Sequence, residues 1–243
     1  MNSDLVGALV LMAYYLLVVA MLPILFKYWF NLPKEYVRKI HHVGYSLSIF
    51  LLLDLFSSWY MAVGAALLLV VLGYPFLWLV EKSSFYRKYF VDRTKGKGEL
   101  RKQLLYVQLS FAMLIFIFWG LLGAQWYYVA AVAVMAWGFG DAAAALVGKA
   151  VGRRHVIHQY IERAKTYEGT IAMVVVAGTA LFITLVFYAG FSWLPSLLIS
   201  LIGGPVCGIV ELFSRRGLDT LTVPLSVSAV IFPLIYLFTL LGD

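Results

Sequence analysis

Charged residues are scarce in this sequence, at 13% of its 243 residues, whereas about a quarter of the residues in a soluble domain are charged. Hydrophobic residues make up 63%, which excludes an ordinary soluble globular protein. Cysteine is almost absent: Cys207 cannot form a disulfide within the chain, and we expect it to be a packing residue. No spacing of cysteine and histidine indicates a zinc site. The composition therefore predicts a membrane protein whose function rests on its few charged side chains.

Eight apolar runs approach the length that crosses a membrane, which is about 20 residues of helix. They cover residues 5–26, 43–56, 59–80, 104–122, 126–149, 169–188, 193–213 and 222–241. The second run is short. The first has no basic segment before it and is too long for a signal peptide, so we expect it to be the first span. We predict an all-α, polytopic membrane protein with seven or eight transmembrane helices, forming a single integral-membrane catalytic domain over residues 1–243.

Lysine and arginine lie in only four of the connections between these runs. Residues 27–42, 81–103, 149–168 and 214–221 contain 4, 8, 5 and 2 of them, which together are all 19 in the chain. Because basic connections stay in the cytoplasm, we expect these four there and both termini outside, in the plasma membrane if the organism is prokaryotic. The net charge of +7 then reflects topology and attraction of anions, so nucleic acid is not an expected partner. Nothing in the sequence indicates an oligomeric state.

The connection 81–103 carries eight basic and three acidic residues. Contact with anionic lipid headgroups explains this charge. Gly96 and Gly98 would also permit a lid over a nucleotide, and the sequence leaves both interpretations open.

Asp141 lies inside the fifth run, although an ionised side chain at the bilayer centre costs at least ~2.5 kcal/mol. It lies ~22 Å along a helix that begins at Trp126, in the cytoplasmic third of the membrane. Gly138 and Gly140 precede it, and we expect them to break the helix where backbone groups face a polar cavity. Two interpretations stay open: close helix packing on small residues, or a phosphate chain held by Mg²⁺ on Asp141. In the second, three cations meet the remaining negative charge: Lys149, Arg153 and Arg154.

Three more groups of polar residues are expected at the same membrane boundary. Glu211 ends a face of small residues in the seventh run, and Asp219 follows eight residues later. Residues 165–169 read KTYEG, in which Thr166 is typical of a helix N-cap and Glu168 suits a first turn. A basic segment at the entry to the second helix contains Arg38, Lys39, His41 and His42.

Four carboxylates and a set of cations at one boundary are the composition of a metal–phosphate site, because oxygen ligands bind Mg²⁺ and cations neutralise phosphate oxygens. A Walker A sequence is absent, because the lysine of GDAAAALVGK is followed by alanine and not by serine or threonine. A transporter would typically carry its polar groups near the membrane midplane. We therefore predict chemistry on a lipid headgroup with a soluble cytosolic reagent.

Four segments in this order resemble the family of CTP-dependent polyprenol kinases, which includes phytol kinases, dolichol kinases and their bacterial and archaeal relatives. They are RKIHHVG, GFGDAAAALVGKAVGR, KTYEG and ELFSRRGLDTLTVP, and the resemblance covers about residues 38–224. It implies transfer of the γ-phosphoryl group of CTP, with Mg²⁺ as cofactor, to the hydroxyl of a membrane isoprenoid alcohol (phytol, geranylgeraniol, dolichol or another polyprenol). The chain departs from the pattern at Thr220, where phytol kinases tend to have asparagine.

The resemblance also implies roles for individual residues. Catalytic roles fall to Asp141, Glu168 and His42. Metal binding falls to Asp141, Glu168, Glu211 and Asp219. The nucleotide and its phosphates are expected to contact Arg38, Lys39, Gly138, Gly140, Gly148, Lys149, Arg153, Arg154, Lys165, Thr166 and Gly169. The expected partners are thus CTP, a membrane isoprenoid alcohol and the lipid bilayer.

Two alternatives remain at the level of the sequence. A CTP-dependent cytidylyltransferase acting on phosphatidate or a related lipid would also use Mg²⁺ but would release pyrophosphate. Its distal segment typically has two closely spaced aspartates, whereas SRRGLDTLTVP has one. A non-enzymatic transporter or membrane scaffold would use its acids only to pair with the basic connections.

Overall fold

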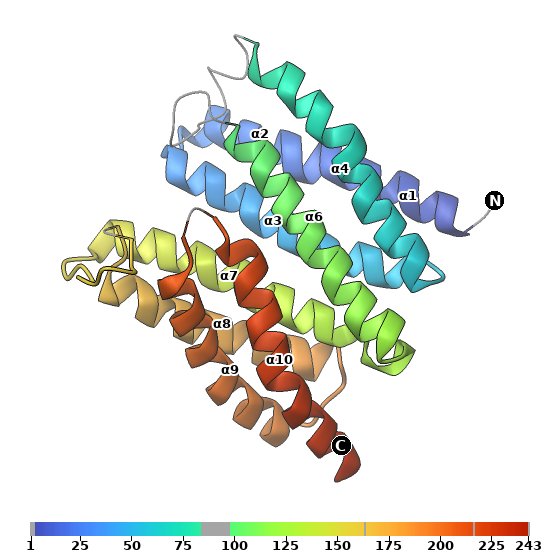
Figure 1. Cartoon of the computed structure of the whole chain (residues 1–243). Coiled ribbons are helices and arrows are strands. Elements are labelled where there is room, and N and C mark those ends of the chain that lie inside the picture. Colours follow the sequence, from blue (N-terminus) through green and yellow to red (C-terminus); the bar gives the residue numbers. More distant parts are fainter. Residues whose placement is uncertain (1–2, 84–97, 163, 216, 243) are drawn as a thin grey trace. The chain divides into compact units, whose positions relative to one another are not determined.

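The computed structural model describes residues 3–83, 98–162, 164–215 and 217–242 (Figure 1). Every regular element among them is helical, apart from one isolated β-bridge between His155 and Thr166. The predicted all-α class is therefore confirmed. The chain divides into two compact units, Met1–Leu122 and Gly123–Asp243, and a single catalytic domain stays a prediction. Most of the basic connection 81–103, with most of the lid considered there, lies outside the described residues.

The described residues of unit 1 form four long helical segments. The first consists of α1 (Ser3–Tyr14), a π-helical stretch (Tyr15–Met21) and α2 (Leu22–Phe30). The others are α3 (Lys34–Asp54), α4 (Trp59–Glu81) and α6 (Glu99–Ile115), which a second π-helical stretch (Phe116–Leu121) extends. Asn31 ends α2 in the left-handed conformation, with φ of 47°, and Pro33 precedes α3. α3 packs against α1, α2, α4 and α6, so it is the central helix of this unit.

Unit 2 contains four long helices after a short 3₁₀ turn (Ala124–Trp126). They are α7 (Tyr128–Val151), α8 (Tyr167–Phe187), α9 (Trp193–Phe213) and α10 (Asp219–Leu240). α7 packs against α8 and α10, and α9 packs against the same two helices, so the four close into a bundle. Cys207 is buried in α9, as expected for a packing residue.

Seven helical segments of the described chain are long and apolar enough to cross a membrane. The remaining predicted span, residues 43–56, corresponds to α3, which has 21 residues but begins with charged ones. Its predicted start at residue 43 is wrong, because Pro33 starts the helix at Lys34 and polar residues fill the first turns. The segment RKIHHVG consequently lies within α3 and not ahead of it.

α7 runs without interruption past Asp141, so the helix break expected at Gly138 and Gly140 is wrong. A Cβ atom on Gly140 would lie 2.7 Å from Sδ of Met173 and 3.0 Å from Cβ of Ala177. Gly140 therefore allows α8 to approach closely, as small residues do between membrane helices. Packing, and not an opening of the backbone, accounts for this glycine.

Glycine also sets the closest approach between α8 and α9. A Cβ atom on Gly204 would lie 2.7 Å from the carbonyl oxygen of Val174, a backbone atom that cannot turn aside. Gly204→Ala is therefore expected to lower the free energy of unfolding by ~1–3 kcal/mol, the usual cost of overpacking. Thermal unfolding in detergent measures this change.

The matched control for that experiment is Gly64→Ala in α4, where an added Cβ would meet nothing within 4 Å. Alanine favours helix over glycine, so the unfolding midpoint of the control should stay the same or rise. Equal midpoints for the two variants would contradict the close approach of α8 and α9.

A chain of hydrogen bonds crosses the interior of unit 1. The side-chain amide of Gln108 in α6 donates to the hydroxyl of Tyr15, which is hydrogen-bonded to Oγ of Ser48 at 3.0 Å. The Ser48 hydroxyl donates to the carbonyl oxygen of Tyr45 at 2.7 Å, so Tyr15 is the donor to Ser48. Gln108 and Ser48 are fully buried. Because buried polar groups need partners, these bonds fix the first helical segment, α3 and α6 to one another.

Candidate functional site

Unit 2 places its predicted acids toward the end of the bundle where α7 and α9 finish and α8 and α10 begin (Figure 1). Glu168 lies in the first turn of α8, and Glu211 lies in the last turn of α9. Asp219 is the first residue of α10, and Asp141 lies in the second half of α7. The up-and-down order of the four helices therefore gathers carboxylates that are distant in the sequence.

A buried ion pair lies at the centre of this group. Nζ of Lys165 is paired with Oε1 of Glu211 and also donates to the backbone carbonyl of Glu211 at 3.0 Å. Glu211 is 4% exposed. Asp141 and Asp219 both interact electrostatically with Glu211. The Lys165 ammonium group thus pairs with one member of a set of three carboxylates, whose like charges raise each other's energy in a medium of low dielectric constant.

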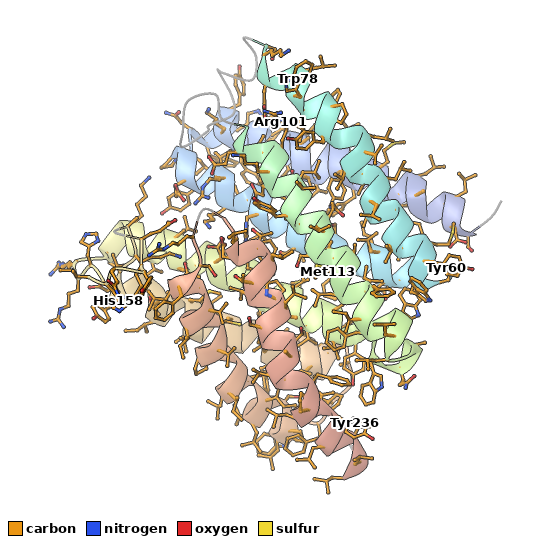
Figure 2. The ribbon with its side chains drawn as sticks, in the orientation of Figure 1. Tyr60, Trp78, Arg101, Met113, His158 and Tyr236 are labelled. Atoms are coloured by element: carbon orange, nitrogen blue, oxygen red, sulfur yellow. The ribbon has the colours of Figure 1, made fainter. Side chains whose placement is uncertain are left out.

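The loop between α7 and α8, residues 152–166, brings Lys165 to this position. The backbone N–H of Val156 donates to the carbonyl of Lys165 at 3.0 Å, and that of Tyr167 donates to the carbonyl of Arg154 at 3.0 Å. These bonds flank the bridge between His155 and Thr166, so the loop is a short hairpin. Figure 2 shows it with His158 labelled. Backbone hydrogen bonds, and not side-chain packing alone, set the place of Lys165.

Thr166 and Glu168 both contact the backbone around the start of α8. Oγ1 of Thr166 accepts a hydrogen bond from the N–H of Gly169 at 3.1 Å, which confirms the predicted N-cap. Oε2 of Glu168 accepts from the N–H of Arg154 at 3.4 Å. Glu168 thus links the hairpin to α8.

The glycines near this end mediate helix packing. A Cβ atom on Gly148 would lie 3.0 Å from Oγ1 of Thr166, and one on Gly169 would lie 2.8 Å from the carbonyl oxygen of Ala144. Gly138 is buried. The contacts of Gly140, Gly148 and Gly169 favour the packing interpretation, while their predicted contact with phosphate stays a prediction. By contrast, Lys149, Arg153 and Arg154 are exposed, so anions can reach them from solvent.

The predicted residues of α3 form a cluster within unit 1. Arg38 is paired with Glu35 one turn away and with Oε1 of Glu99 in α6, at 3.7 Å. Nδ1 of His42 is 3.2 Å from the side-chain amide nitrogen of Gln103. Lys39, which follows Arg38 in the sequence, is also buried. The segment RKIHHVG therefore fastens α3 to the start of α6, and the catalytic role of His42 stays a prediction.

Comparison with known proteins identifies the family. No family model and no solved structure matches the chain. A phytol kinase from Synechocystis sp. is 30% identical to it over 200 residues, which are 79% of this chain and 76% of that protein. The chain belongs to the phytol and polyprenol kinase family. It is a prenol-type kinase, and its long apolar helices make it an integral membrane protein.

Within this kinase, the described residues contain no group of three or more His, Cys, Asp or Glu side chains close enough to hold a metal ion by themselves. Mg²⁺ at nucleotide sites usually binds only one or two carboxylates and takes its other ligands from phosphates and water. Asp141 and Asp219 interact electrostatically with Glu211, and Glu211 is paired with Lys165. One or two of these carboxylates could hold Mg²⁺ together with the phosphates of a nucleotide, and that role stays a prediction.

The sequence did not reveal several partners of the predicted residues in this kinase. The pair of Glu35 and Arg38 could have been found, because residues three apart on a helix are neighbours. Glu99 and Gln103 lie about 60 residues from the α3 residues that they contact, and no local pattern joins them. Arg215 was also missed, because its partners are backbone carbonyls.

Proposed function

We propose that this kinase transfers the γ-phosphoryl group of CTP to the hydroxyl of a membrane isoprenoid alcohol. The relative whose name is phytol kinase supports an alcohol of this class, since phytol is an isoprenoid alcohol. The observation that carries the proposal is the buried pair of Lys165 and Glu211, with Asp141 and Asp219 in electrostatic contact. An ammonium group among carboxylates, at the end of a membrane bundle, suits a nucleotide phosphate chain and its metal ion.

The cations have the first task in this proposal, which is to bind and orient the phosphates. Lys165 presents a compact positive charge, and its position is set by hydrogen bonds to both the side chain and the backbone of Glu211. Three exposed cations precede Lys165 in the sequence: Lys149, Arg153 and Arg154. Their positive charge attracts the nucleotide from the cytoplasm. Positioning and neutralisation of charge supply most of the acceleration in phosphoryl transfer.

The carboxylates have the second task. Asp141, with one or two of Glu168, Glu211 and Asp219, would hold Mg²⁺. When bound, the ion would neutralise charge on the β- and γ-phosphates as the transfer proceeds. Glu211 already has a cation partner in Lys165, which offsets part of the cost of burying its carboxylate.

The proposed reaction is a phosphoryl transfer from CTP to the alcohol. The oxygen of the alcohol attacks the γ-phosphorus, the bond from that phosphorus to the β–γ bridging oxygen breaks, and CDP leaves. The hydroxyl proton passes to a base, for which the candidates are a carboxylate of this set and His42. The isoprenoid tail stays in the cytoplasmic leaflet while the hydroxyl reaches the membrane boundary.

Purified protein in detergent micelles tests the proposal with CTP labelled at either the γ- or the α-phosphate. The acceptors are phytol, geranylgeraniol, a dolichol, diacylglycerol and phosphatidate. We expect γ-label on an isoprenoid alcohol and the α-label in CDP. Transfer of α-label to phosphatidate with release of pyrophosphate would instead show a cytidylyltransferase. Faster transfer from ATP or GTP than from CTP would refute the choice of nucleotide, and γ-label on diacylglycerol alone would refute the choice of alcohol.

A further inference from the structure

Arg215 makes a forked contact with the α7–α8 loop. It lies two residues beyond the end of α9, and its Nε donates to the carbonyl oxygen of Tyr160 at 2.7 Å. Its Nη2 donates to the carbonyl oxygen of Gln159 at 2.6 Å. Its guanidinium carbon is also 5.9 Å from the centre of the Tyr160 ring, within the range of a cation–π interaction. Two neighbouring carbonyls and one ring thus meet a single side chain.

A second contact joins the same two regions. The ring of His158 lies edge-on to the ring of Phe213, with centroids 6.1 Å apart, and Phe213 is the last residue of α9. The tip of the loop, residues 158–160, is therefore fastened to residues 213–215. The base of the loop is fastened to the same helix end through Lys165 and Glu211. One stretch of five residues, 211–215, therefore holds the loop at its tip and at its base.

The chemistry at residue 215 requires arginine. A guanidinium group has several N–H donors in a rigid planar fork, which can reach two successive carbonyls at once. A lysine ammonium has the same charge but no such fork, and it does not stack on a ring with its plane. The carbonyl partners are backbone atoms, so the side chain of Gln159 takes no part in the two hydrogen bonds.

We infer that Arg215 is a positioning residue of the phosphate site, because it fastens the loop that carries Arg153, Arg154 and Lys165. This inference rests on the function proposed above. A loop that is already in place binds the nucleotide without a further ordering cost, whereas a released loop weakens apparent affinity by the fraction of time that it is in place. Arg215 itself points to the loop carbonyls.

Arg215→Lys tests the inference, with Arg215→Gln as the variant that also removes the charge. We expect the KM for CTP to rise about tenfold in Arg215→Lys, as for a loop that is in place about a tenth of the time. The KM for the alcohol and kcat at saturating CTP should stay close to those of the unsubstituted protein. A merely structural role would instead lower the amount of active enzyme and leave both KM values unchanged.

Hydrogen exchange of a peptide covering residues 155–161 supplies a readout that needs no activity. The amide of Val156 is bonded to Lys165 and that of Ile161 to His158, so both should exchange about tenfold faster in Arg215→Lys without nucleotide. Tyr160→Leu removes the ring and keeps the carbonyl, so its effect should have the same direction and be smaller. Thr222→Val is the control, because Thr222 bonds Ser214 in the same connection and the carbonyl of Leu218 one turn away, and neither partner belongs to the loop.

The outcomes separate this inference from the proposed function. Unchanged exchange in both Arg215 variants, or faster exchange with an unchanged KM for CTP, would overturn the positioning role. If the unsubstituted protein transferred no label from CTP, the proposed function would fail. Binding of inorganic tripolyphosphate would then serve as the probe: weaker binding by Arg215→Lys supports the inference, and equal binding overturns it.

Discussion

Asp141→Asn is expected to lower the rate of phosphoryl transfer by about 10²–10⁴-fold, comparable to the loss of a placed acid or base, while the protein stays folded. Asparagine has the size of aspartate and removes only the charge. Because Asp141 and Glu211 repel each other, losing that charge should not lower the unfolding midpoint. The measurement is γ-label transfer from CTP at saturating alcohol, with thermal unfolding and size-exclusion elution of the same preparation.

Asp54→Asn is the matched control for Asp141→Asn, because Asp54 is an exposed aspartate that no predicted site includes and is the last residue of α3. Its turnover should remain within about twofold of the unsubstituted protein, as expected for a surface substitution. Near-normal turnover in Asp141→Asn would remove Asp141 from the catalytic assignment. A fall in both variants would show a general effect of charge.

Lys165→Met is expected to lower the free energy of unfolding by about 3–5 kcal/mol and to abolish activity. The substitution leaves the Glu211 carboxylate buried without its cation and next to two like charges, which is the costly way to break a buried ion pair. The double variant Lys165→Met with Glu211→Gln removes both charges and should recover most of the stability. It should not recover activity, because the phosphate-binding cation is still absent. Thermal unfolding and label transfer on the two single variants and the double variant give the full cycle.

The stability control for this cycle is Lys149→Met, an exposed lysine at the end of α7. Exposed ion pairs contribute at most about 1 kcal/mol, so its unfolding midpoint should barely move. If Lys165→Met were as stable as this control, the pair with Glu211 would not be a stabilising contact. A double variant with normal activity would show that Lys165 does not bind the phosphates.

The helices of this kinase could be predicted from the sequence, because membrane helices are continuous apolar runs. Their ends could not. α3 begins at Lys34 and α6 at Glu99, well before their apolar parts, because a helix continues through polar turns wherever the backbone has no reason to stop. At Gly138 and Gly140 the low helix propensity of glycine predicted a break, whereas α7 is continuous there. A neighbouring helix packed on Gly140 outweighs that preference, and only the three-dimensional arrangement contains it.

The grouping of site residues was partly within reach of the sequence. The charge pattern put Asp141, Lys165 and Glu211 at one depth, and the structure places Lys165 against Glu211, with Asp141 in electrostatic contact. Pairing itself could not be derived, because hydropathy gives depth but not which side chains face each other. The contacts of Arg215 were further out of reach, since backbone carbonyls carry no mark in the sequence.

The hydrogen bonds of Tyr15 have a consequence for the synthesis of the protein. Ser48 follows Tyr15 by 33 residues and Gln108 follows it by 93, so the first helix is made long before its partners. An unsatisfied polar group in hydrocarbon costs several kcal/mol, which disfavours release of that helix alone into lipid. During synthesis the first helix therefore gains its hydrogen-bond partners only after α3 and α6 have been made. The interior hydrogen bonds of unit 1 are complete only when translation has passed Gln108.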